Sequence, residues 1–221
     1  MIAAHRSRVS AWWLLGPGLL FGFSFLAAVL TTSTPDKNLV YNLPAILVTA
    51  VVDVVLAAYV VFAVWISKAP IADTLALRRT PLWRAVGLGT LALVALIVLD
   101  KLVDPITHAS KKQGIAPDHT PVDTHQWIAL GVAFVALAVI APVAEELMFR
   151  GLAWDVMGRF ALPGTAAFWA MAHSLPALLL PVFLAGLVIG ELRRRTDSLW
   201  PGLAVHMITN TTALVVALLT A

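Results

Sequence analysis

Residues 126–152 read QWIALGVAFVALAVIAPVAEELMFRGL. The stretch is apolar over 127–144, and it then carries the adjacent carboxylates Glu145 and Glu146, followed by Arg150. A helical apolar run of about 20 residues matches the hydrocarbon thickness of a bilayer. The stretch therefore predicts a transmembrane helix that bears ionisable groups toward its end.

The rest of the chain has the same character. Of 221 residues, 60% are hydrophobic and 12% are charged, whereas a soluble domain carries about 25% charged residues. We therefore expect an all-α, polytopic transmembrane helical bundle of about seven or eight helices, forming a single membrane domain over 1–221. The candidate spans are 11–31, 44–66, 86–103, 127–149, 163–176, 177–192 and 199–220.

Charge and cysteine content narrow the function classes. The net charge of +3 is small, and in a membrane protein a basic excess usually lies in cytoplasmic loops. We therefore expect the lipid bilayer, and no nucleic acid, as a partner. The chain has no cysteine, which excludes thiolate catalysis and cysteine metal sites.

The basic residues follow alternate spans, as the positive-inside rule predicts for a cytoplasmic N-terminus. We therefore expect a multi-pass protein, in the plasma membrane, whose Glu145 end is also cytoplasmic. The residues that support this topology are Arg6, Arg8, Lys68, Arg78, Arg79, Arg84, Arg150, Arg159, Arg193, Arg194 and Arg195.

The two carboxylates of the fourth span differ in their expected surroundings. Glu146 and Arg150 are separated by four residues and share a helix face, so they can form an ion pair. Glu145 points about 100° away and is the freer carboxylate. A partly buried carboxylate can act as a general base. An ion pair at the helix end, with Glu145 reaching water, explains the pattern equally well.

Two further segments carry polar residues in apolar surroundings. FWAMAH places Trp169 and His173 four residues apart, and HMITN places His206 and Asn210 four residues apart in the last span. Each pair alone is as typical of helix packing as of a site. Together with Glu145, however, they supply a base, its partner and an oxyanion site, the parts needed for water attack on a peptide carbonyl. We expect the fifth span to start late, tilt or be re-entrant, so that the three segments can converge.

These segments resemble the CAAX-processing and bacteriocin-processing (CPBP, or Abi) family of intramembrane proteases over residues 125–215. EELMFR is similar to its EExxxR motif, WAMAH to its FxxxH motif with Trp169 in place of phenylalanine, and HMITN to its HxxxN motif. The resemblance implies an endopeptidase with a peptide or membrane-anchored protein substrate, of the CAAX or bacteriocin type.

The resemblance also implies roles for single residues. Glu145 would activate the water with help from His173, and His206 with Asn210 would hold the oxyanion. Glu146 and Arg150 would be orienting or structural, and Trp169 would line the substrate path.

The sequence is compatible with a zinc-dependent and with a metal-free mechanism. The chain has no HExxH motif, the usual helix of zinc proteases, whereas Glu145, His173 and His206 could in principle ligate zinc. We favour a metal-free, glutamate-activated water. The alternative functions are a non-catalytic immunity or regulatory membrane protein with the same fold, and a small transporter. A transporter would spread polar residues over more spans and depths than these three helices.

Overall fold

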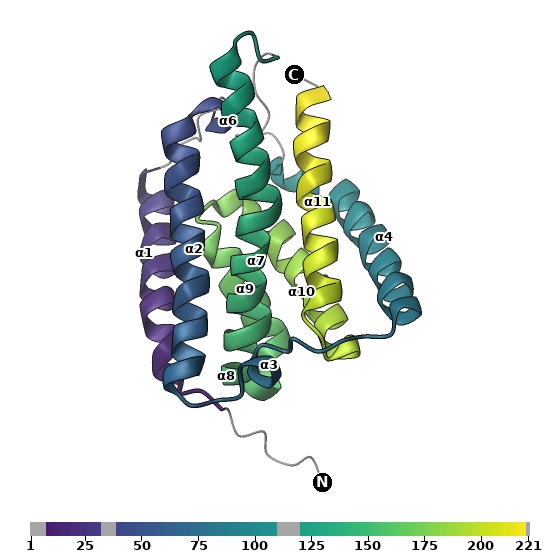
Figure 1. Cartoon of the computed structure of the whole chain (residues 1–221). Coiled ribbons are helices and arrows are strands. Elements are labelled where there is room, and N and C mark those ends of the chain that lie inside the picture. Colours follow the sequence, from purple (N-terminus) through teal and green to yellow (C-terminus); the bar gives the residue numbers. More distant parts are fainter. Residues whose placement is uncertain (1–7, 32–38, 110–119, 220–221) are drawn as a thin grey trace.

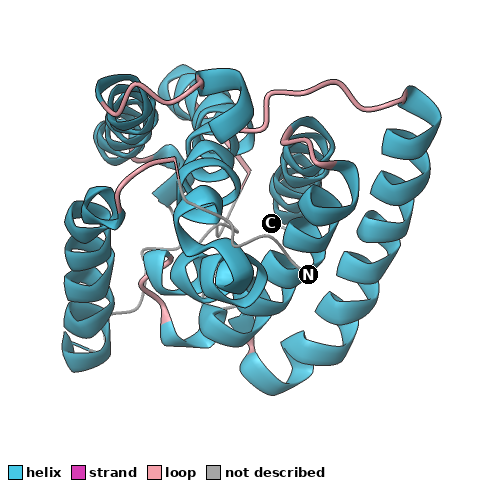
Figure 2. Ribbon diagram, turned by 90° about the horizontal axis from the view of Figure 1, so that it is seen from below, coloured by secondary structure: helices cyan, strands magenta, loops and turns pink. Residues whose placement is uncertain are grey.

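A computed structural model describes residues 8–31, 39–109 and 120–219. Over these residues the protein is a bundle of helices without a strand, as Figure 1 and, from below, Figure 2 show. Six helical stretches are long and apolar enough to cross a membrane. The predicted all-α, polytopic bundle is therefore confirmed. Arg6 of the topology argument lies outside the described residues, as do 32–38 and 110–119.

The helices begin and end as follows. The α-helices are α1 (Leu15–Thr31), α2 (Leu43–Ile66), α3 (Ile71–Thr74), α4 (Leu82–Thr107), α6 (Thr124–Val135), α7 (Ala141–Glu145), α8 (Ala153–Met157), α9 (Ala161–Ala172), α10 (Leu179–Thr196) and α11 (Trp200–Leu219). The π-helical segments are η3 (Ala136–Ile140) and η4 (Glu146–Leu152), and the 3-10 turns are η1 (Ala11–Leu14), η2 (Leu39–Tyr41), η5 (Gly158–Phe160) and η6 (Pro176–Leu178).

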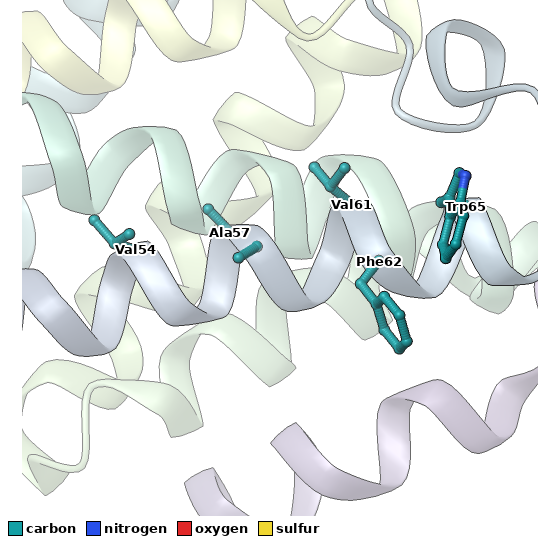
Figure 3. Close-up of a pocket in the computed structure, with 6 residues that line it drawn as sticks. Val54, Ala57, Val61, Phe62 and Trp65 are labelled. Carbon is teal, nitrogen blue, oxygen red and sulfur yellow. The ribbon is translucent and has the colours of Figure 1, made fainter.

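The outer helices turn apolar side chains away from the bundle. In α2, an almost entirely apolar helix, Val51, Val55 and Trp65 are 61–63% exposed. A helix with an apolar exposed face is more stable in contact with lipid than with water. A hollow of about 580 Å³ on this helix, lined by Val54 and Phe62 among other apolar residues, has the same character (Figure 3). It contains none of the predicted site residues.

The central element is one nearly continuous helical rod, from α6 to α8. Asp123 caps its start by accepting a hydrogen bond from the backbone N–H of Gln126 at 2.8 Å. The rod runs on to Met157, beyond the predicted end at residue 149, and stops at Gly158, whose φ of 52° favours glycine. The two π-helical segments interrupt it around Pro142. A proline lacks the N–H that continues an α-helical ladder, and π-helical turns are frequent at functional sites.

The predicted fifth and sixth spans form an unequal hairpin, α9 and α10. Helix α9 has 12 residues, about 18 Å at 1.5 Å per residue, which is too short to cross a bilayer alone. Ser174, with φ of 52°, and η6 turn the chain into the 18 residues of α10. The helices approach so closely at Gly186 that a Cβ there would lie 2.9 Å from Cα of Ala166. The hairpin brings Trp169, near the end of α9, into the interior of the bundle, where it is 4% exposed.

Basic residues lie at one end of the bundle, where their ion pairs and hydrogen bonds connect the loops. Arg8 lies 3.8 Å from Asp73 of α3, and Arg78 pairs with both Asp73 and Asp197, which follows α10. The hydrogen bond to Asp73, with Asp197 nearby, raises the pKa of Arg78, so this residue stays charged. Arg84 reaches the carbonyl of Arg195 at 2.8 Å. The predicted clustering of these basic residues at one end is therefore present.

Arg150 is the exception among the basic residues of the topology argument. We expected it after the fourth span, but it lies inside the rod with no exposed side-chain surface. The helix continues for seven residues beyond it, to Met157, so Arg150 is part of the core rather than of a basic loop.

Candidate functional site

The rod and the last helix bring three ionisable side chains together. The carboxylate of Glu146 has one oxygen, Oε1, that lies 3.2 Å from Nη1 of Arg150 and 3.1 Å from Nδ1 of His206. Glu146 and Arg150 have no exposed side-chain surface, and His206 has 4%. The expected ion pair between Glu146 and Arg150 is present. Glu146 also contacts His206, a contact that the sequence does not predict. Buried charges need such partners, because leaving water is costly for each of them.

The contact with Glu146 selects the tautomer of a neutral His206 ring. An ionised carboxylate only accepts hydrogen bonds, so Nδ1 of His206 carries a proton. In the neutral ring Nε2 is then an acceptor, and it faces Oε2 of Glu145 at 3.7 Å. The adjacent residues Glu146 and Glu145 therefore face Nδ1 and Nε2, respectively, of the same imidazole.

Glu145 is the more accessible of the two carboxylates, as expected from the sequence. Its side chain is 21% exposed, while that of Glu146 is fully buried. Its Oε2 accepts a hydrogen bond from the indole N–H of Trp169 at 2.5 Å. The side chain is therefore held in place and yet open to a water molecule.

Trp169 of α9 is in contact with four of the site residues. Besides donating to Glu145, its ring lies under the guanidinium of Arg150 at 4.4 Å. Its ring centre is 5.3 Å from that of His173 and 5.1 Å from that of His206, both edge to face. The sequence suggested only an aromatic wall here.

His173 ends α9, and its nearest polar contact is not the expected one. Its Nδ1 lies 3.0 Å from the carbonyl oxygen of Trp169, one turn back. The indole of Trp169 rather than a direct contact connects His173 with Glu145. Trp169 thus lies between Glu145 and His173, and the help expected of His173 in activating the water stays a prediction.

Asn210 also has a partner that the sequence did not suggest. Its amide nitrogen donates to the carbonyl of Leu137 at 2.8 Å, inside the first π-helical segment. In the second segment, the carbonyl of Arg150 accepts from Nε of Arg193 at 3.3 Å. Side chains from α11 and α10 thus satisfy carbonyls in the irregular parts of the rod, as a backbone away from water requires. Arg193 was hidden in a run of three arginines, and only the fold reveals its partner.

Asp53 of α2 lies near the site. Its Oδ2 is buried without a hydrogen-bond partner, and the side chain lies within electrostatic reach of Glu145. Helix α2 packs along α7 and both π-helical segments. A valine-rich sequence around Asp53 indicated only that a carboxylate stands in a membrane span.

The donor set does not suit the zinc site that the sequence left open. Within the described residues, no three His, Asp or Glu side chains are grouped so that they could hold a metal ion. Of the three potential ligands, Glu145 and His206 are close, but His173 turns its Nδ1 to a backbone carbonyl. We therefore derive no step through a metal.

Comparisons with known proteins agree with this part of the chain. Residues 127–212 match the family model described as type II CAAX prenyl endopeptidase Rce1-like. The matched range contains Glu145, Trp169, His173, His206 and Asn210. Searches of curated proteins and of solved structures gave no match.

Proposed function

We propose that this chain, a CPBP-family member whose residues 127–212 match the Rce1-like family model, hydrolyses a peptide bond of a membrane-associated substrate through a water activated by Glu145. One observation carries the proposal: a partly exposed carboxylate and a fixed imidazole face each other on separate helices. Among the described residues, six helical stretches are apolar and long enough to cross a membrane, and together with the family match they make this an integral membrane protein. We take residues 125–215 as the hydrolytic core of a single membrane domain.

The separation of Glu145 and His206 suits one water molecule. Oε2 and Nε2 are 3.7 Å apart, so a single water can approach both at about 2.8 Å, a normal hydrogen-bond distance. Glu145 would take a proton from this water as its oxygen attacks the scissile carbonyl carbon. The C–N bond would then break, and the proton would pass to the leaving amine.

Glu146 and Arg150 would act through His206. Their ion pair fixes Nδ1 of the ring, which leaves Nε2 directed at Glu145. A His206 ring that has taken a second proton from solvent before the substrate binds can donate a hydrogen bond from Nε2 to an oxyanion. This proton stays on the ring while Glu145 passes the water proton to the amine. The second N–H of the Asn210 amide, which the bond to Leu137 leaves over, is the proposed other donor. His173 would complete the wall beside Trp169.

The substrate and its side of approach follow from the same placement. We propose a CAAX-type C-terminal peptide or another membrane-anchored peptide, entering from the end that carries the basic residues, which we take as cytoplasmic. The plasma membrane is the proposed location. The test is cleavage of a farnesylated CAAX peptide by the purified protein and by Glu145→Gln, where loss of cleavage in the variant is expected. Equal inactivity of both proteins on a broad peptide panel would instead support a non-catalytic role.

A further inference from the structure

We propose that Trp169 is a positioning residue whose indole N–H holds the Glu145 carboxylate in the orientation in which it accepts a proton from the attacking water. The inference rests on the proposed function, because it assigns Trp169 a role through Glu145. It goes beyond an aromatic lining of the substrate path, which requires no N–H.

The direction of the hydrogen bond is unambiguous. An indole has one N–H and no acceptor, so Nε1 of Trp169 donates to Oε2 of Glu145, at 2.5 Å. The tryptophan is 4% exposed, which leaves water little access to its N–H. Hydrogen bonds to an ionised acceptor are roughly twice as strong as neutral ones. The contact thus favours the charged carboxylate and keeps it in one orientation.

The indole is itself fixed by its neighbours. The guanidinium of Arg150 lies 4.4 Å from the ring centre, and the His173 and His206 rings meet it at 84° and 73°. A Cβ placed on Gly186 of α10 would come within 3.3 Å of the indole Cε3. These packed neighbours hold the ring, and its N–H is directed at Glu145 without any substrate present.

Other ionisable groups also lie near Glu145. Asp53 from α2 is a second carboxyl group, and Arg150 on the same rod is a cation; both lie within electrostatic reach of Glu145. His206 from α11 faces the same oxygen, Oε2, at 3.7 Å, and the third helix, α9, contributes the Trp169 N–H with His173 behind it. Among these neighbours, Trp169 makes the hydrogen bond that holds Oε2 of Glu145.

The first test compares pH–rate profiles of the wild type and Trp169→Phe on the farnesylated peptide. Phenylalanine keeps an aromatic face but has no N–H, so the ionised carboxylate loses its donor and deprotonates less readily. We expect the acidic limb of the kcat profile to move to higher pH by about one unit, with kcat reduced about tenfold or more below that limb and KM changed less. An acidic limb that stays in place, or moves to lower pH, overturns the inference.

A matched control is available in α8. Trp154 also lies beside an arginine, with Cζ of Arg193 at 5.5 Å from the ring, but it makes no contact with Glu145 within the described structure. We expect Trp154→Phe to keep the wild-type position of the acidic limb. An equal shift in this variant would show that loss of any indole, rather than of this N–H, moves the profile, and would overturn the inference.

The second test does not require activity. The chain has eight tryptophans, and the indole N–H resonance that is missing in the spectrum of ¹⁵N-labelled Trp169→Phe belongs to Trp169. We expect it to move upfield in Glu145→Ala, because the hydrogen bond is lost, and to stay in place in Trp154→Phe. A resonance unaffected by Glu145→Ala overturns the inference. A shifted resonance in a protein that cleaves no peptide would instead uphold the contact and reject the proposed function.

Discussion

Nδ1 of His206 lies 3.1 Å from Oε1 of Glu146, although 60 residues separate them along the chain. The same oxygen contacts Arg150 at 3.2 Å. Glu146 of the rod therefore orients His206 of α11. Glu146, Arg150 and His206 form one connected unit. The role of the second glutamate follows from this contact rather than from the ion pair alone.

Replacing Glu146 by glutamine tests this unit. The amide is nearly the same size, but it leaves the buried guanidinium of Arg150 without its counter-charge. Breaking a buried pair in this way costs about 3–5 kcal/mol. We expect a clear drop in the thermal unfolding temperature in detergent, and slower peptide cleavage because His206 loses its fixed orientation.

The double variant Glu146→Leu/Arg150→Met provides the control for stability. Removing both charges leaves no unpaired one, so we expect it to unfold at a higher temperature than Glu146→Gln. If Glu146→Gln unfolds at the wild-type temperature, the pair does not stabilise the fold as described.

The close approach of α9 and α10 gives a prediction about packing. In Gly186→Ala the new Cβ would lie 2.9 Å from Cα and Cβ of Ala166 and 3.3 Å from the Trp169 ring. Because backbone cannot give way as a flexible side chain can, we expect a loss of about 1–3 kcal/mol in the free energy of unfolding, together with reduced activity. Thermal unfolding in detergent measures the first effect.

Gly131→Ala in α6 is the matched control, since a Cβ there meets no atom within 4 Å. Alanine is favoured over glycine inside a helix by about 1 kcal/mol, so this variant should be as stable as the wild type or more so. Equal unfolding temperatures for Gly186→Ala and Gly131→Ala would contradict the helix contact.

The carboxamide of Asn210 can be tested with leucine, which has a similar shape and no donor. We expect kcat to fall by about 10²–10³, the usual effect of removing one oxyanion donor, with a smaller change in KM. Thr212→Val, on an exposed turn of the same helix, should retain wild-type kinetics. A wild-type kcat in Asn210→Leu would show that Asn210 does not bind the oxyanion and serves only to hydrogen-bond the carbonyl of Leu137.

Metal removal should leave cleavage unchanged. The described residues contain no group of three His, Asp or Glu side chains that could hold a metal ion, and the proposed water is activated by Glu145 alone. We therefore expect the same rate before and after treatment with a strong zinc chelator. Inhibition that is reversed by added zinc, with one zinc bound per chain, would reject the metal-free mechanism.

The general architecture could be predicted because hydrophobic run length decides it. The runs of α1, α2 and α4 are long enough to span a bilayer, and the spacing of Glu146 and Arg150 already predicts their ion pair. Spacing within one helix says nothing of the rotation of one helix against another. The contacts of Glu146 with His206, and of Trp169 with Glu145, could therefore not be read from the sequence.

The irregular parts of the rod were equally beyond prediction. The two π-helical segments rotate the following residues relative to a regular helix, and their stability depends on partners from other helices. Asn210 supplies one of these partners and Arg193 another. The short length of α9 could not be predicted either, because the sequence is apolar on both sides of Ser174 and shows no clear helix end there.

The most direct test of the central claim is the rate of peptide cleavage by the wild type and by Glu145→Gln, in lipid nanodiscs, with a farnesylated CAAX peptide. Glutamine keeps an oxygen that can accept the indole hydrogen bond, but it cannot take a proton from water. The account predicts release of the C-terminal fragment by the wild type and a loss of at least about 10²-fold in the variant, with an unchanged unfolding temperature. Cleavage by Glu145→Gln at the wild-type rate would show that Glu145 is not the general base.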